Sequence, residues 1–227
     1  MEFFKYHSLG NDYILIDSLQ GSTALSPEDI RMLCHRNLGI GADGIIVMEP
    51  SRRAVCRMIN FNPDGSQADV SGNGLRCLGK HLYEMGIHAE EEMGVETASG
   101  VKRLILQVTL GKVAGVEVNM GRPDFRRSAI PMAGEGDEAV ESPLEVCGRQ
   151  LTATCLAVGN PHCVLFVESP DEATVRELGP AIENHPLFPL RVNVEFAQVM
   201  NMSEMRLRSW ERGAGETMAS ATGACAA

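Results

Sequence analysis

The segments DVSGNGLRC (residues 69–77) and TMASATGAC (residues 217–225) share one design, in which a serine heads a turn of small residues that contains glycine. Serine is a favoured N-cap residue, because its hydroxyl oxygen accepts a backbone N–H of the first helical turn. Both segments therefore predict the start of a helix, the first at Ser71 and the second at Ser220.

These two segments belong to a longer internal repeat. Four pairs of residues lie 149 positions apart: Ser71 and Ser220, Gly74 and Gly223, Asn11 and Asn160, and Asn62 and Glu211. One spacing at four places predicts two half-domains of related build that face each other across a shared cleft. We place the N-terminal half-domain at residues 1–118 and the C-terminal half-domain at residues 119–227.

Strand and helix patterns support this division. Residues 26–39 read as a helix that Ser26 caps, Pro27 begins and Gly39 ends, and residues 74–86 read as a second helix. Most of the remaining N-terminal half reads as short strands. Residues 121–143 are rich in Pro, Gly and Glu and predict an exposed connector, after which strands surround a further helix at residues 169–183.

Composition narrows the class of function. The formal net charge of −10 argues against non-specific binding to nucleic acid or to anionic membranes. No signal peptide is evident, and the apolar runs are too short to span a bilayer. The seven cysteines form no CxxC pair, which favours free thiols in the cytoplasm over disulfides or a zinc site.

Two further motifs lead to no cofactor or metal. GIGADG (residues 39–44) has the glycine spacing of a dinucleotide fingerprint, but it follows a helix and precedes a strand, the reverse of the required order. The acidic residues Asp43, Asp64 and Asp69 lack the spacing of a metal-binding loop. We therefore expect no nucleotide and no metal site.

The two serine turns suggest a chemistry when they are taken together. A helix N-terminus presents N–H groups that attract a carboxylate, and two such ends that converge would hold one from both sides. A side chain at each cap would then lie on opposite faces of the neighbouring α-carbon, which suits two-base epimerisation. The alternative is that Ser71 and Ser220 serve only as N-caps.

Serine is a poor proton-transfer group for this chemistry. A general acid or base works best with a pKa near the working pH, and a cysteine thiol starts at about 8.5, far below a serine hydroxyl. The turns therefore look like thiol sites in which oxygen replaces sulfur.

At this point a family resemblance becomes visible along nearly the whole chain. The motifs that carry it are HSLGND (7–12), GIGADG (39–44), NPDGS (62–66), SGNGLRC (71–77), GNPHC (159–163), NHPLFP (184–189), VNVEF (192–196) and ERGAGET (211–217). With these motifs the chain resembles the diaminopimelate epimerases, cofactor-independent epimerases of lysine and cell-wall biosynthesis. The resemblance implies an α+β fold of two pseudo-symmetric half-domains, each a curved, mainly antiparallel sheet around a central helix, with the active site in the cleft between them.

The resemblance also implies roles for particular residues. Catalysis would fall to Ser71 and Ser220, at the positions where the family has cysteine, with His162 and Glu211 tuning them. The substrate would be held by residues of both halves: Asn11, Gly44, Asn62, Gly72, Asn73, Asn160, Asn193, Glu211, Arg212, Ala221 and Thr222. The implied substrate is diaminopimelate, the implied cofactor is none, and the implied assembly is a homodimer in the cytoplasm.

The chain departs from the family pattern where the chemistry lies. Both turn heads are serine, so we expect this form to be inactive or nearly so, either by deliberate substitution or as a natural inactive homologue; a serine-dependent epimerase is the remaining reading. Ala221 stands at a usual glycine, Ser8 replaces another, and the chain stops at Ala227, one turn into the second helix, as a truncated chain would. Epimerisation of another amino acid, or amino-acid binding without catalysis, are the alternative functions.

Overall fold

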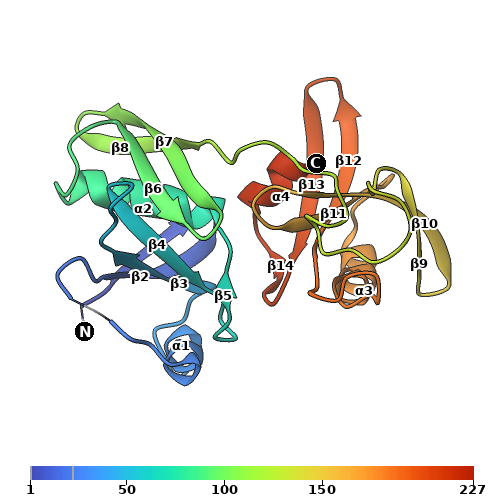
Figure 1. Ribbon diagram of the computed structural model, residues 1–227, viewed down its shortest axis with the longest axis horizontal. Coiled ribbons are helices and arrows are strands. Elements are labelled where there is room, and N and C mark those ends of the chain that lie inside the picture. The colour runs from blue at the N-terminus through green and yellow to red at the C-terminus, as the bar shows by residue number, and fades with distance from the viewer. Residues whose placement is uncertain (1, 22) are drawn as a thin grey trace. The chain divides into compact units, whose positions relative to one another are not determined.

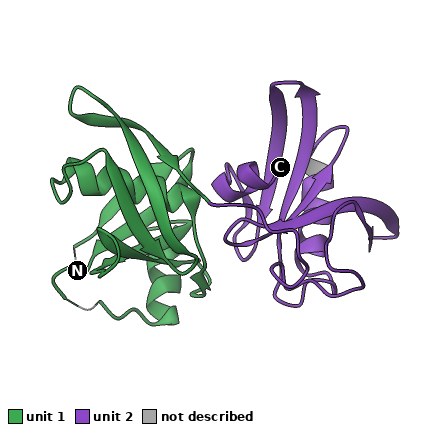
Figure 2. Ribbon diagram, turned by 45° about the horizontal axis from the view of Figure 1, so that its top comes forward, with its two compact units in different colours: residues 1–120 green, residues 121–227 purple. Residues whose placement is uncertain are grey.

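The computed structural model describes residues 2–21 and 23–227, which divide into two compact units (Figure 2). Unit 1 contains residues 1–120 and unit 2 contains residues 121–227. Each unit is an α+β structure rich in strands, as the sequence predicts. None of the helices in the described residues is long and apolar enough to cross a membrane.

Unit 1 is a curved sheet that carries one long helix on its concave side (Figure 1). Its elements are β1 (Phe4–Ser8), β2 (Asn11–Asp17), α1 (Pro27–Cys34), β3 (Gly44–Glu49), β4 (Cys56–Phe61), β5 (Gln67–Ala68), α2 (Gly72–Glu84), β6 (Glu92–Thr97), β7 (Gly100–Thr109) and β8 (Lys112–Val118). The strands follow the order β1-β2-β3-β4-β6-β7-β8, and the short β5 pairs with β4.

Helix α2 is held in the curve of this sheet by its apolar face. Leu75, Leu78 and Leu82 are fully buried, and burial of each side chain stabilises the unit by about 2 kcal/mol. At Gly79 an added Cβ would lie 2.9 Å from Leu104 of β7, so glycine is needed for the close approach of helix and sheet. The packing fixes where α2 begins, and so it positions Ser71.

Unit 2 is a second sheet with two helices. Its elements are β9 (Ser142–Val146), β10 (Arg149–Ala157), β11 (Pro161–Phe166), α3 (Glu172–Glu183), β12 (Asn193–Asn201), β13 (Glu204–Glu211), β14 (Gly215–Thr217) and α4 (Ala221–Ala226). The strand order is β14-β13-β12-β11-β10-β9, and α3 packs on β12, β13 and β14. Gly179 of α3 lies against Trp210, whose ring an added Cβ would approach to 2.7 Å.

The internal repeat is present in the strand pairing of the two units. Each unit has a parallel pair, β2 with β3 and β11 with β12, followed by two antiparallel pairings. Corresponding partners, 149 positions apart, are Tyr13–Gly44 and His162–Asn193, Ile45–Phe61 and Val194–Trp210, and Asn60–Ala68 and Ser209–Thr217. The repeat therefore extends from the sequence to the register of three strand pairs.

Some local expectations are corrected by the structure. The first helix has Ser26 as its N-cap, but it ends at Cys34 rather than near Gly39, and the following residues form turns. Strand β9 begins at Ser142, inside the expected connector. The connector also holds two isolated bridges, one of which joins Asp124 to Ala157.

Candidate active site

The first serine turn has the geometry of a capped helix start. Ser71 is extended, with φ −131° and ψ 115°, and its Oγ accepts a hydrogen bond from the Gly74 N–H at 3.0 Å. Gly72, Asn73 and Gly74 are buried behind it. An added Cβ at Gly74 would lie 3.0 Å from Cδ1 of Ile46, so this turn rests on an apolar side chain.

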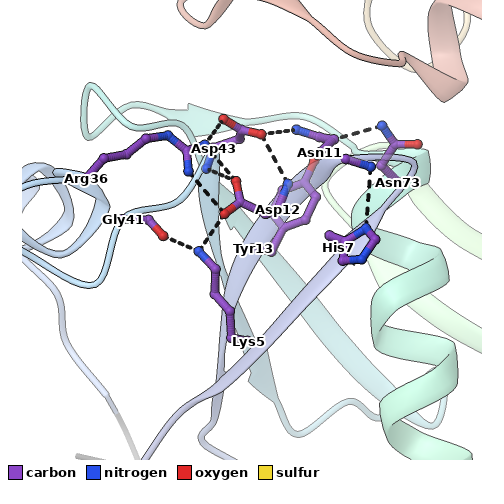
Figure 3. A network of polar contacts seen from close by, with 10 residues as sticks. Lys5, His7, Asn11, Asp12, Tyr13, Arg36, Gly41, Asp43 and Asn73 are labelled. Carbon is purple, nitrogen blue, oxygen red and sulfur yellow. Dashed lines mark hydrogen bonds and ion pairs between the residues drawn. The ribbon is translucent and has the colours of Figure 1, made fainter.

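A chain of polar side chains leads away from Ser71 within unit 1. The Tyr13 hydroxyl lies 2.7 Å from Ser71 Oγ and donates to Asn11 Oδ1 at 2.5 Å. The same Asn11 oxygen accepts a hydrogen bond from Asn73 Nδ2 at 3.0 Å (Figure 3). Asn11, Tyr13 and Asn73 are all buried, so these contacts are shielded from water.

A charged cluster fixes the orientation of Asn11 from the other side (Figure 3). Asn11 Nδ2 donates to Asp43 Oδ2 at 3.1 Å, which turns its Oδ1 toward Tyr13 and Asn73. Arg36 binds both Asp43 and Asp12, and Lys5 lies 2.6 Å from Asp12. Burial alone would raise the pKa of Asp12, but hydrogen bonds from Arg36 and Lys5 outweigh it and hold this pKa well below its ordinary value.

The second serine turn repeats the backbone of the first. Ser220 has φ −116° and ψ 120°, and its Oγ accepts a hydrogen bond from the Gly223 N–H at 3.2 Å. The helix it caps, α4, has six residues where α2 has thirteen. An added Cβ at Gly223 would lie only 2.6 Å from Glu195 Oε1, so this turn rests on a carboxylate.

A buried histidine and glutamate lie beneath the second turn. His162 and Glu195 are fully buried, and His162 Nδ1 lies 2.9 Å from Glu195 Oε1. His162 Nε2 lies 2.8 Å from Asn160 Oδ1, and Asn160 Nδ2 donates to Thr222 Oγ1 at 3.4 Å. With a polar side chain beside each ring nitrogen, His162 is fixed in orientation between Asn160 and Glu195.

Glu211 brings a second carboxyl group to this turn. It ends β13, and its Oε1 accepts a hydrogen bond from Thr217 Oγ1 at 2.6 Å. Burial raises the pKa of Glu211, and hydrogen bonds with Thr217 and Ser220 oppose that shift. A carboxyl group with a raised pKa, in contact with Ser220, can exchange protons closer to neutral pH.

The structure gives the other predicted site residues contacts of their own. Asn193 donates to the Pro161 carbonyl at 2.8 Å and accepts from the Arg212 N–H at 2.9 Å, while the Arg212 side chain donates to the Leu190 carbonyl at 3.3 Å. Asn62 donates to Ser66 Oγ at 3.0 Å within its own turn. A Cβ at Gly44 would lie 3.2 Å from the Tyr13 ring, so Gly44 makes room for that ring.

The structure therefore brings together two groups of the predicted site residues, one in each unit, and adds one further residue to each group. Unit 1 joins Ser71, Gly72, Asn73 and Asn11, and unit 2 joins Ser220, Ala221, Thr222, Asn160, His162 and Glu211. Tyr13 and Glu195 were missed. Tyr13 lies 149 positions before His162, and Glu195 is a charged residue in the apolar run VNVEFAQVM, so both had a signal in the sequence.

The chain is similar in sequence to known diaminopimelate epimerases. The family model described as diaminopimelate epimerase matches residues 3–126 and 154–227. The diaminopimelate epimerase of Moorella thermoacetica is 51% identical over 231 residues, which cover 100% of this chain and 82% of the relative. That of Pelotomaculum thermopropionicum is 47% identical and that of Methanothermobacter thermautotrophicus 44%, over 82% and 80% of their lengths and 100% and 99% of this chain.

Solved structures share the fold at much lower sequence identity. A probable proline racemase from Agrobacterium radiobacter has a TM-score of 0.71 at 17% identity, over 95% of this chain and 72% of its own. A hydroxyproline epimerase from Agrobacterium vitis has a TM-score of 0.69 at 16% identity, over 95% and 71%. At these identities the likeness concerns the fold alone.

Proposed function

Because the chain belongs to the diaminopimelate epimerase family, we propose that its two serine turns are the two proton-transfer positions of a diaminopimelate epimerase. The reaction interconverts LL- and meso-diaminopimelate at one α-carbon. The observation that carries the proposal is the duplicated turn, in which Ser71 and Ser220 have nearly the same backbone angles and the same Oγ hydrogen bond.

The proposed reaction needs one group on each face of the α-carbon. The group at position 71 or 220 removes the α-proton, which leaves a carbanion stabilised by the neighbouring carboxylate. The group at the other position donates a proton to the opposite face, so the centre is inverted. The substrate gains and loses one proton, the two groups end with their protonation states exchanged, and proton exchange with water restores both groups before the next turnover.

Serine limits this chemistry because a hydroxyl does not ionise near neutral pH. A thiol in the same place starts at a pKa of about 8.5, and it is lowered further at a helix N-terminus. We propose that positions 71 and 220 are cysteine sites in which this chain has serine, and that the chain as written has little or no epimerase activity.

The remaining site residues supply binding and proton balance in this proposal. First-turn N–H groups at residues 72–73 and 221–222 hold the α-carboxylate, and the imidazole of His162 and the carboxyl of Glu211 tune position 220. The residues proposed to bind the rest of the substrate are Asn11, Gly44, Asn62, Asn160, Asn193 and Arg212. We further propose that the reaction needs no pyridoxal phosphate, and that the protein acts as a cytoplasmic homodimer.

The direct test is exchange of the α-proton of diaminopimelate in deuterated water, followed by proton NMR. The chain as written is compared with Ser71→Cys/Ser220→Cys, and Ser203→Cys, at an exposed hairpin tip, is the control for an added thiol. We expect exchange at least a hundredfold faster in the double variant alone, since a competent general base contributes about 10²–10⁴. Equal rates in all three proteins would overturn the proposal.

A second function is favoured by the serines themselves. If both are functional as they stand, the chain binds an amino acid without turning it over. Calorimetric binding of diaminopimelate, with no α-proton exchange in the double cysteine variant, would establish that reading. The same pair of measurements with other amino acids tests whether another substrate is epimerised.

A further inference from the structure

We propose that Tyr13 is a positioning residue for position 71, whose hydroxyl donates a hydrogen bond to the ionised form of the proton-transfer group there. This inference rests on the proposed function, because only a group that ionises needs such a donor. Its basis is the 2.7 Å contact between the Tyr13 hydroxyl and Ser71 Oγ, made inside unit 1 by two residues 58 positions apart.

The internal repeat assigns Tyr13 and His162 to the same place in their units. Tyr13 pairs with Gly44 in the β2–β3 register, and His162 pairs with Asn193 in the β11–β12 register. Each ring contacts the side-chain oxygen of the asparagine two residues before it, Asn11 in one case and Asn160 in the other. Tyr13 is therefore the counterpart in unit 1 of a residue already expected to tune the second turn.

The direction of the hydrogen bonds follows from the asparagine. Asn11 Nδ2 donates to Asp43, so Asn11 Oδ1 faces Tyr13 and accepts from it. While the tyrosine proton lies toward Asn11, the phenol oxygen accepts the proton of the Ser71 hydroxyl at 2.7 Å.

Ionisation of the group at position 71 reverses this arrangement. An anion there cannot donate, so the tyrosine hydroxyl rotates about its C–O bond and donates to the anion. Asn11 Oδ1 keeps its hydrogen bond from Asn73 Nδ2, at 3.0 Å, so this oxygen still has a donor after the rotation. No proton is transferred between residues in this step. Because hydrogen bonds to charged groups are the stronger ones, the rotation favours the ionised form.

The ring is held in place for this role. Tyr13 is 5% exposed, and Gly44 lies against the ring, where a Cβ would come within 3.2 Å. The hydroxyl can therefore rotate while the ring stays fixed, and replacement by phenylalanine removes the donor without removing the ring.

The test uses Ser71→Cys, in which the position carries a thiol that can be titrated. Its alkylation by iodoacetamide is followed against pH by mass spectrometry of the tryptic peptide spanning residues 58–76, which contains no native cysteine. Tyr13→Phe in this background should raise the midpoint by about one to two pH units, which is the worth of a charge-assisted hydrogen bond. Alkylation near pH 7.5 should fall at least about tenfold, while the plateau at high pH stays the same.

The matched control is Tyr6→Phe in the same background. Tyr6 belongs to the same unit, and its hydroxyl lies 3.2 Å from His81 Nδ1 rather than at the turn. This variant should leave the midpoint unchanged. Equal midpoints for Tyr13→Phe and the unmodified background would overturn the inference, as would a change in the plateau alone, which reports accessibility.

The inference and the proposed function fail separately, since alkylation needs no substrate. A shifted midpoint together with no α-proton exchange in Ser71→Cys/Ser220→Cys supports the positioning role and overturns the epimerase proposal. Exchange in that double variant with an unshifted midpoint does the reverse.

Discussion

The two serine turns have one backbone and two different surroundings. Behind Gly74 the first turn meets Ile46, and behind Gly223 the second meets Glu195, which is the residue 149 positions later. Beside the first turn is the hydroxyl of Tyr13, and beneath the second is the buried hydrogen-bonded pair of His162 and Glu195. The backbone that positions the capping serine is the same in both units, while the side chains that surround the serine differ in charge and polarity.

The largest effect on stability is expected when phenylalanine replaces the equivalent ring of each unit, Tyr13 in unit 1 or His162 in unit 2. His162→Phe leaves the buried Glu195 carboxyl group without its hydrogen-bond partner, which should cost about 3 kcal/mol of unfolding free energy. Tyr13→Phe removes neutral hydrogen bonds and should cost about 1 kcal/mol. Urea unfolding followed by circular dichroism measures both.

A double variant shows whether the lost partner is the cause. In His162→Phe/Glu195→Met neither member of the buried pair is left without its partner, so most of the lost stability should return, as a coupling between the two substitutions. Equal costs for the two phenylalanine variants, or no recovery in the double variant, would contradict a coupled polar pair beneath the second turn.

A smaller difference is expected when alanine replaces the two turn glycines. Gly223→Ala brings a Cβ within 2.6 Å of a carboxylate oxygen that His162 holds, so we expect a loss of about 2 kcal/mol. Gly74→Ala meets the ends of Ile46 and Met58, at 3.0 and 3.4 Å, which can move. Its helix propensity gain of up to about 1 kcal/mol should offset most of that strain.

Trp210, the only tryptophan of the chain, reports the unfolding of unit 2 by fluorescence, and circular dichroism reports the whole chain. If Gly74→Ala proves as damaging as Gly223→Ala, the second turn is no more tightly packed than the first.

The smallest expected effect is on the pH dependence of stability. The pKa of Glu211 is raised in the folded protein, so its protonated form is favoured there, and stability is lost as pH rises from about 4.5 through the folded pKa. Glu211→Gln should therefore be more stable than the parent at pH 8, with the gap closing toward pH 4. Urea midpoints across this range measure it.

Asp12 in unit 1 should behave in the opposite way. Its pKa is lowered in the folded protein, so its contribution is present above about 3.8 and is lost as the pH falls below that value. Asp12→Asn should be less stable than the parent at pH 7, and the difference should shrink on acidification. A stability difference between Glu211→Gln and the parent that widens toward low pH would contradict the raised pKa of Glu211.

Much of this arrangement could be predicted from the sequence, because local patterns carry it. The α+β class and the family are confirmed, and Ser26, Ser71 and Ser220 are N-caps, a position at which serine is among the favoured residue types. The 149-residue spacing also held in the strand registers, since duplicated chains keep the pairing that buries their apolar faces.

Other parts could not be predicted, because they depend on contacts between distant residues. Nothing near Tyr13 in the sequence says that its hydroxyl reaches Ser71, and nothing near Glu195 says that His162 is its partner. The role of an asparagine is hard to predict for another reason, because its side-chain amide can form hydrogen bonds either with a ligand or with backbone groups. Asn193 is buried between the Pro161 carbonyl and the Arg212 N–H. Its proposed role toward substrate, like those of the other site residues, stays a prediction.

The central claim is that each turn serves one face of a single α-carbon, and the single variants Ser71→Cys and Ser220→Cys test it most directly. Each is incubated in deuterated water with LL-diaminopimelate and with the meso isomer, and deuterium at the α-carbon is measured alongside Ser71→Cys/Ser220→Cys. We predict that each single variant exchanges one isomer without inverting it, and that the two variants select opposite isomers. Exchange of the same isomer by both variants would contradict it.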